Sequence, residues 1–337
     1  MTGIKEGNFW ERLRKPAFTL APMEDVTDTV FREIVMQVSD PGCLHVIFSE
    51  FTSTDGFVHE VGGPKVKHRL RINGSERELL RKTGVKIVAQ VWGADPEKHA
   101  KTAQIICEEG EFDGIDINMG CPVKKIVKQG ACSALIGNPT LAKEIILATQ
   151  EASTIPVSIK TRIGINKVIT EEWIGHLLET RPVLITIHGR IQKQQSEGIA
   201  DWNEVAKAVK LRDQMNPETL IHGNGDVMSY EDGLQKANDY VVDGIMVGRG
   251  IFQNPWFFNK QQIEHSPEER LRLLYKHAFL FTETWESEKN FAIMKRFFKI
   301  YTSGFPGAVK IRADLMETNS LDDVRKVLEN CDFNVSG

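Results

Sequence analysis

The chain has 337 residues, a net charge of −4 and five cysteines. An odd cysteine count without a C-x-x-C motif or a Cys/His cluster argues against a disulfide framework and against a metal site of the structural zinc type. The charged segment 1–16 lacks the apolar core of a signal peptide, and no apolar run approaches the ~18 residues of a membrane span. We therefore expect a soluble, cytoplasmic protein without a membrane partner.

Short β-rich apolar segments alternate with amphipathic helical segments along the first 260 residues. The predicted strands are 18–22, 44–50, 86–93, 112–118, 157–162, 183–189, 220–225 and 243–248. The predicted helices 96–110, 139–151, 201–213 and 229–239 each begin at a proline or a capping residue. This order predicts an α/β fold, a (β/α)8 TIM barrel. A doubly wound sheet is the alternative, but eight repeated units, with strands ending in polar or glycine residues, favour the barrel.

The pattern changes after residue 260. Residues 267–333 are predicted to be helical and strand-free, with helices over 267–286, 290–304 and 320–330 and a turn at 305–307. We therefore predict two domains, a barrel over residues 1–260 and a small helical domain over residues 261–337.

Two segments are rich in basic residues. Segment 65–82 has seven Lys and Arg against two Glu, and segment 289–312 has six basic residues and no acid. Such segments are commonly solvated surfaces, but two of them on an acidic chain favour a polyanionic partner. Within 291–301, apolar residues recur at helical spacing and should face the core. The basic residues that this pattern leaves toward solvent, and that we predict to contact such a polyanion, an RNA in particular, are Lys295, Arg296 and Lys299.

Active sites of (β/α)8 enzymes lie at the carboxyl ends of the strands. These ends carry Met23, Gln90, Asn118, Cys121, Lys160, Arg162, His188, Asn224 and Arg249. So many functional side chains on one face predict a lined pocket. Lys160 and Arg162 are two apart on one strand, so they point the same way and indicate an anionic or electron-rich ligand. Solvated charges at a strand end are the alternative, and His188, taken alone, is more often a structural histidine.

Two glycine-rich loops, 222–227 and 247–255, follow the last two predicted strands. Many barrels bind a phosphate at this position with backbone N–H groups. Arg249 could add a charge-assisted hydrogen bond. The alternative is a pair of tight turns that use glycine at positive φ.

Cys121 and Cys132 lie eleven residues apart. Gly120 and Pro122 predict a sharp turn that presents the Cys121 thiol at the barrel mouth, whereas Cys132 is typical of a small packed residue. A thiol with the ordinary pKa of ~8.5 is mostly protonated at neutral pH. It can therefore donate a proton, or act as a nucleophile once ionised. The residues alone do not choose between these roles.

The motifs taken together resemble those of the tRNA-dihydrouridine synthases. The matching segments are 21–32, 88–93, 117–136, 158–164, 185–190, 200–202, 223–227 and 243–258, and the helical segment after them is similar to the family's RNA-binding domain. The resemblance implies an oxidoreductase that binds FMN and reduces the C5–C6 double bond of a uridine in the D-loop of tRNA. It further implies NADPH as the electron donor.

The resemblance also implies roles for individual residues. Pro22, Met23 and Glu24 would line the flavin through their backbone, with Gln90, Lys160 and His188 close to the ring system. The residues matching the phosphate and ribityl region are Asn224, Gly225, Asp226, Gly248 and Arg249. Asn118 and Arg162 would lie on the substrate side. Cys121 matches the family's proton donor.

The chain departs from the common family pattern at Glu24-Asp25 and at residues 191–194. Two other functions compete with the one implied. An FMN-dependent barrel oxidoreductase could act on a free pyrimidine or another small molecule, but such a substrate needs no basic docking surface. A tRNA-binding protein with a vestigial barrel would not need the flavin motifs or Cys121.

Overall fold

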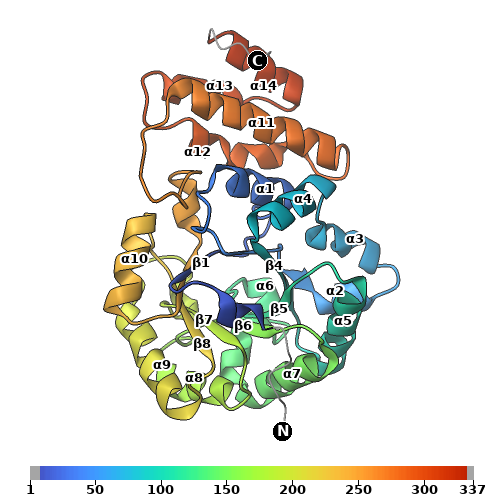
Figure 1. The fold of residues 1–337 in the computed structure, drawn as a ribbon. Coiled ribbons are helices and arrows are strands. Elements are labelled where there is room, and N and C mark those ends of the chain that lie inside the picture. Colours follow the sequence, from blue (N-terminus) through green and yellow to red (C-terminus); the bar gives the residue numbers. More distant parts are fainter. Residues whose placement is uncertain (1–7, 332–337) are drawn as a thin grey trace.

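Eight parallel strands close into a barrel in the lower part of the molecule as drawn in Figure 1. The computed structural model describes residues 8–331, so the outer ends of the two predicted domains, residues 1–7 and 332–337, lie outside the described residues. The barrel strands are β1 (Ala17–Leu20), β2 (Val46–Phe48), β4 (Lys86–Trp92), β5 (Gly114–Met119), β6 (Val157–Arg162), β7 (Leu184–His188), β8 (Leu220–Asn224) and β9 (Gly244–Val247). Pairing of β1 with β9 and of β2 with β4 closes the ring, and the two-residue β3 (Thr52–Ser53) extends along β4. The predicted strands and the (β/α)8 fold are confirmed.

Helices surround the barrel on its outside (Figure 1). The longer ones are α1 (Thr29–Val38), α4 (Gly74–Thr83), α5 (Pro96–Glu109), α7 (Pro139–Ala152), α8 (Thr170–Leu178), α9 (Trp202–Met215) and α10 (Tyr230–Asp239). Shorter helical turns are η1 (Phe9–Arg12), α2 (Thr54–Val58), α3 (Gly63–Lys67), η2 (His68–Leu70), α6 (Lys124–Val127), η3 (Cys132–Gly137), η4 (Gln192–Gln194) and η5 (Arg249–Phe252). The four predicted barrel helices are confirmed. In α5 the cap is as expected, because the Asp95 side chain accepts hydrogen bonds from the Glu97 and Lys98 amides and Gly110 ends the helix at φ 66°.

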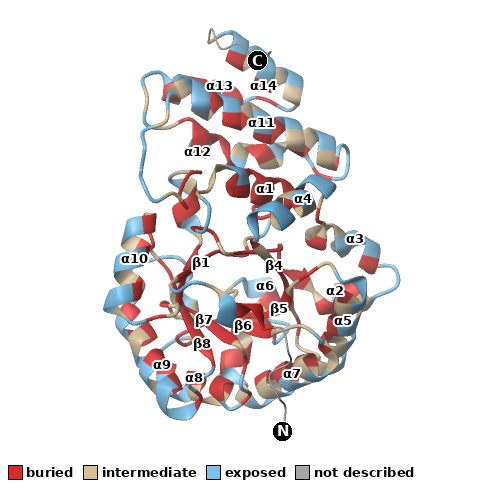
Figure 2. Ribbon diagram, viewed as in Figure 1, coloured by how far each residue is buried: buried red, intermediate tan, exposed pale blue. Residues whose placement is uncertain are grey.

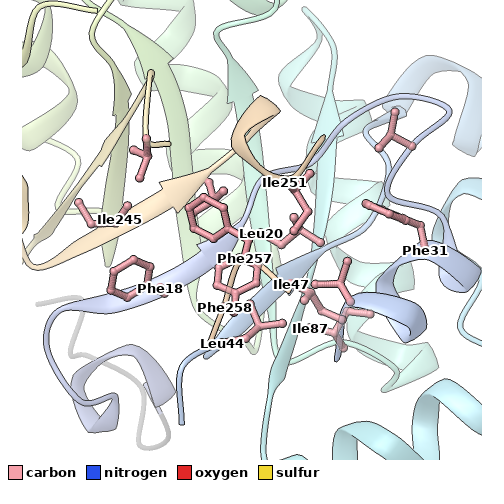
Figure 3. Close-up of a cluster of buried hydrophobic side chains, with 14 of the residues drawn as sticks. Phe18, Leu20, Phe31, Leu44, Ile47, Ile87, Ile245, Ile251, Phe257 and Phe258 are labelled. Carbon is pink, nitrogen blue, oxygen red and sulfur yellow. The ribbon is translucent and has the colours of Figure 1, made fainter. Parts of the chain in front are cut away.

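The strands are buried on both faces, as expected for parallel strands under a layer of helices (Figure 2). Figure 3 shows Phe18, Leu20 and Ile47 from the strands packed with Phe257 and Phe258 from the segment after η5. Burying each large apolar side chain contributes roughly 1.5–3 kcal/mol, and this layer fixes where the strand ends lie.

A helical region follows the barrel. It contains α11 (Pro267–Trp285), η6 (Phe291–Arg296), α12 (Phe298–Tyr301), α13 (Ala308–Met316) and α14 (Leu321–Glu329). Helix α11 begins with a capping box between Ser266 and Glu269, and α11 and α14 match their predicted ranges closely. Within residues 8–331, every helix is too short or too polar to cross a membrane.

The prediction of one helix over 290–304 is wrong. The segment divides into the 3-10 helix η6 and the single turn α12. Phe291, Met294 and Phe297 recur every three residues, which is the period of a 3-10 helix, and Ile300 and Tyr301 further along are both buried. Helix α13 was not predicted.

The helical region packs on α1 of the barrel domain (Figure 1). Lys289, counted above among the basic surface residues, is instead buried at this junction. Its Nζ lies 3.0 Å from Glu50 Oε2, 3.5 Å from Asp28 Oδ2 and 4.0 Å from the centre of the Trp285 ring. Trp285 Nε1 donates to Asp28 Oδ2 at 2.7 Å. We call Lys289, Glu50, Asp28 and Trp285 the junction cluster.

Candidate active site

Cys121 lies in a turn after β5 that is held from several sides. The amides of Gly120 and Cys121 both donate to Asn118 Oδ1 at 3.0 Å. Arg162 Nε donates to the Gly120 carbonyl at 2.7 Å, and the Ser133 hydroxyl donates to the Cys121 carbonyl at 2.6 Å. The thiol is therefore placed by the ends of β5 and β6, at the carboxyl end of the barrel.

Cys121 and Cys132 are neighbours in space. Cys132 is fully buried, as expected of a packed residue, and lies in the cluster against which Cys121 packs. A hydrogen bond from the Cys132 thiol is the largest cause that lowers the pKa of Cys121 to about 7, with burial opposing it. Burial raises the pKa of Cys132 itself, so Cys132 stays protonated and donates. The ordinary thiol pKa used in the sequence analysis does not include this lowering, because neither the contact with Cys132 nor the fold around it is visible in the sequence.

A chain of buried side chains runs beneath this turn. Asn118 Nδ2 donates to Gln90 Oε1 at 3.0 Å, and Gln90 Nε2 donates to Asp116 Oδ2 at 2.7 Å. Ser158 Oγ donates to the other oxygen of Asp116 at 2.6 Å. Burial raises the pKa of Asp116 to about 6. Asp116 was not among the predicted site residues, although a carboxylate at an inward position of a buried strand is a signal in the sequence.

Four cations surround His188 at the ends of β6, β7 and β9. Burial lowers the pKa of His188 well below its ordinary value, and the positive charges of Lys160, Arg162, Arg190 and Arg249 lower it further. Lys160 Nζ donates to Asn224 Oδ1 at 3.2 Å, and burial lowers the pKa of Lys160 to about 8. A neutral histidine among several cations makes this end of the barrel suited to an anion.

The two glycine-rich loops pack against each other at the same end. A Cβ on Gly250 would lie 2.2 Å from the Val227 carbonyl oxygen, so glycine is needed for this approach. A Cβ on Gly248 would meet no atom closer than 3.9 Å, so the backbone there borders open space. Gly225 has φ +119°, which favours glycine. Open space beside glycine backbone and cations is what a phosphate group requires, so these residues fit the phosphate of a flavin mononucleotide.

Arg190 is a site residue that the sequence interpretation missed. It is almost fully buried, donates to both oxygens of Asp226 at 2.7 and 2.6 Å, and lies 3.1 Å from His188 Nε2. The Ala200 amide also donates to Asp226, and Arg249 lies 3.7 Å from it. The Asp226 carboxylate thus holds Arg190 in place. The position of Arg190, two residues beyond the end of β7, was the signal available in the sequence.

The segment Pro22–Asp25 forms a tight turn after β1. Met23 N donates to Thr27 Oγ1 at 2.8 Å, and the Asp25 amide donates to Glu50 Oε1 at 2.7 Å. The exposed Glu24 side chain pairs with Arg69 at 2.6 Å. Its carboxylate is therefore engaged with the protein surface, which leaves the backbone of the turn as the part able to line a flavin.

The three predicted RNA-contacting cations differ in exposure. Arg296 and Lys299 are exposed, whereas Lys295 is half-buried. Arg296 lies 3.1 Å from Asp25, so it reaches the turn after β1. In the basic segment 65–82, four cations likewise pair with acids of this chain. The pairs are Lys67–Glu109, Arg69–Glu24, Arg71–Glu288 and Arg77–Glu111.

Comparison with known proteins agrees with this geometry. The family model described as dihydrouridine synthase matches residues 19–336. A probable tRNA-dihydrouridine synthase of Staphylococcus aureus (strain COL) is 41% identical over 324 residues, covering 96% of this chain and 95% of that protein. The probable tRNA-dihydrouridine synthase 2 of Bacillus subtilis (strain 168) is 42% identical over 325 residues, covering 96% of each chain.

Among solved structures, 2-naphthoyl-CoA reductase in complex with 2-naphthoyl-CoA has a TM-score of 0.52 at 10% identity, covering 73% of this chain and 51% of that chain. That likeness concerns the fold alone. The match of the family model over nearly the whole chain, together with these relatives, shows that the chain belongs to the dihydrouridine synthase family.

Proposed function

We propose that this protein reduces the C5–C6 double bond of a uridine in the D-loop of tRNA, with FMN as cofactor, NADPH as electron donor and Cys121 as proton donor. Family membership supports the reaction class, because the curated relatives are named as probable tRNA-dihydrouridine synthases. The observation that carries the proposal is the placement of the Cys121 thiol beside Arg162 and Lys160, at the end of the barrel where the glycine-rich loops and their cations meet.

The FMN phosphate would be held by the loops after β8 and β9. The residues that would hold it and the ribityl chain are Asn224, Gly225, Asp226, Gly248 and Arg249. The turn Pro22–Glu24 would line the ring system through its backbone, with Gln90, Lys160 and His188 close by. When bound, FMN supplies the hydride that adds to C6 of the uracil.

The chain's own residues supply the proton and the charge stabilisation. Negative charge develops toward C5 and the C4 oxygen of the uracil as the double bond is reduced, and the cations of Lys160 and Arg162 stabilise it. Cys121 donates its thiol proton to C5. Asn118 and Arg162 hold the turn that aims the thiol. The uridine has to leave its base stack to reach this depth in the barrel.

The helical region would bind the remainder of the tRNA. We place its boundary near residue 260, so that the catalytic domain covers residues 1–260 and the tRNA-binding domain residues 261–337. Lys295, Arg296 and Lys299 would contact phosphates, and the pair of Arg296 with Asp25 puts this surface next to the turn after β1. A tRNA substrate also implies a cytoplasmic protein.

The direct test is dihydrouridine formation on an unmodified tRNA transcript with the purified protein, FMN and NADPH, measured by mass spectrometry. Wild-type protein should form dihydrouridine in the D-loop. Cys121→Ala should retain FMN and lose turnover, whereas Cys107→Ala, which removes another partly buried cysteine in α5, should retain both. Wild-type turnover in Cys121→Ala would remove the thiol from the mechanism.

A small-molecule substrate is the competing function, and the same assay separates the two. An FMN-dependent barrel oxidoreductase of that kind would reduce free uridine or uracil and leave the transcript unchanged. If the transcript is reduced and free uridine and uracil do not react, the small-molecule function is excluded.

A further inference from the structure

Asp116 is a carboxylate in the interior of the barrel. It lies in β5 between Gln90 of β4 and Ser158 of β6 in the strand register, and its side chain is fully buried. Burying a carboxylate is costly unless hydrogen bonds and opposite charge compensate it. Gln90 and Ser158 each donate one hydrogen bond to it, at 2.7 and 2.6 Å. An apolar residue would satisfy the packing of this layer, so the carboxylate requires another explanation.

The hydrogen bonds that reach Asp116 have a fixed direction. Asn118 Oδ1 accepts from the Gly120 and Cys121 amides, so the Asn118 amide nitrogen has to be the donor on its other side. It donates to Gln90 Oε1 at 3.0 Å, which leaves Gln90 Nε2 facing Asp116 at 2.7 Å. A carboxylate can only accept, so both ends of the chain fix the same orientation of the Gln90 amide.

We propose that Asp116 is a positioning residue that fixes the amide orientation of Gln90 toward the flavin and anchors, through Asn118, the turn that carries Cys121. This inference rests on the proposed FMN-dependent function. Beyond the bonds to Asp116 and Asn118, the buried Gln90 amide has one further N–H and one further oxygen lone pair, which in the proposed function would face the flavin. Without the charge at position 116, the Gln90 amide can rotate by a half-turn and exchange donor and acceptor at that ligand.

The test is a double-mutant cycle on FMN binding by the apoprotein, followed by quenching of flavin fluorescence. Asp116→Asn keeps the shape and can still accept from Gln90, but it no longer excludes the flipped amide. We expect Asp116→Asn and Gln90→Ala each to raise the FMN dissociation constant about tenfold, and the double variant to raise it about tenfold rather than ~100-fold, since both changes remove one interaction. The absorbance spectrum of bound flavin should change in the same three variants.

Ser158→Ala is the matched control, because it removes the other donor to Asp116 and leaves Gln90 in contact with it. It should change the dissociation constant by less than about twofold. Three results would each overturn the proposal. The effects of the two single changes on the FMN dissociation constant could multiply in the double variant, Asp116→Asn could leave that constant unchanged, or Ser158→Ala could raise it as much as Asp116→Asn does. If Asp116→Asn does not fold, Asp116→Ser, which is smaller and can still accept a hydrogen bond, takes its place in the cycle.

These measurements use no tRNA, so they separate the inference from the proposed function. If the effects of Asp116→Asn and Gln90→Ala on FMN binding are coupled but the protein forms no dihydrouridine, the role of Asp116 is supported and the proposed tRNA substrate is contradicted. Dihydrouridine formation with independent effects of Asp116 and Gln90 would support the substrate and overturn the role of Asp116.

Discussion

Replacing Lys289 by Met should destabilise the protein strongly although the residue lies outside the barrel. The lysine compensates two buried carboxylates, since the side chains of Glu50 and Asp28 are 1% and 6% exposed and its own is 7% exposed. Met fills a similar volume, so the loss is mainly electrostatic. Removing one partner of a buried ion pair typically costs about 3–5 kcal/mol, because the other charge is left buried and unpaired.

The cost of Lys289→Met should depend on pH in a defined direction. Burial raises the pKa of Glu50 above its ordinary value of 4.5, and Lys289 opposes that rise. Without the lysine the pKa of Glu50 in the folded state rises further. A carboxyl group with a raised pKa in the folded state loses stability as pH rises from its unfolded value through its folded value. The difference between wild type and variant should therefore be largest at pH 7 and smaller near pH 5.

Urea unfolding followed by tryptophan fluorescence at pH 7 and pH 5 measures both effects. Glu288→Gln is the control, because it removes a partly exposed pair with Arg71 next to the same junction and should cost roughly 0–1 kcal/mol. This account of the junction cluster would be refuted if Lys289→Met lowered the free energy of unfolding at pH 7 by about 1 kcal/mol or less. It would also be refuted if the decrease were larger at pH 5 than at pH 7.

Three further predictions concern the site. Turnover should fall as pH rises through about 7, since Cys121 donates only when protonated. Cys132→Ala should move this fall to higher pH, because it removes the hydrogen bond that is the largest cause of the lowered pKa of Cys121, and the smaller effects of Glu24, which raises this pKa, and of Arg162, which lowers it, remain; an unmoved pH–rate profile would contradict the contact. Arg249→Ala should raise the FMN dissociation constant about tenfold, measured by flavin titration of the apoprotein, because the phosphate loses a charged partner; an unchanged constant would place the phosphate elsewhere. Changing all three predicted RNA-contacting cations to Ala should raise the KM for tRNA and reduce the slope of log affinity against log salt, with FMN content unchanged; an unaltered slope would assign the RNA to another surface. The three cations are Lys295, Arg296 and Lys299.

The barrel could be predicted because its evidence is local. Most strands are short segments rich in Val, Ile or Leu, and a polar or glycine residue follows most of them directly, so the sequence alone placed Gln90, Asn118 and Lys160 on one face. The segment 290–304 was mispredicted because a 3-10 helix and an α-helix share the i, i+3 spacing of apolar residues. Helix α13 was missed because the signal of its amphipathic pattern is weak.

The contacts that tune the site could not be predicted, because their partners are distant in the sequence. Lys289 and Glu50 are 239 residues apart, and nothing near Lys289 shows that a carboxylate covers it. Arg190 and Asp226 are 36 residues apart and belong to different strand ends. A basic residue in such a segment can lie on a solvated surface or form a buried ion pair. Which of the two it does depends on how the helices and strands pack, and the sequence does not show that.

The turn after β1 connects the two parts of the molecule. The helical region holds it by two cations of different character: Arg296 forms an exposed pair with the Asp25 carboxylate, and the buried Lys289 supports Glu50, which accepts from the Asp25 amide. An exposed pair contributes only about 0–1 kcal/mol to stability. An RNA phosphate can therefore replace Asp25 as the partner of Arg296 with only a small loss of folding stability. The buried pair is unaffected by that exchange. In the proposed function, tRNA could therefore dock on Arg296 while the backbone that lines the flavin stays where the junction cluster holds it.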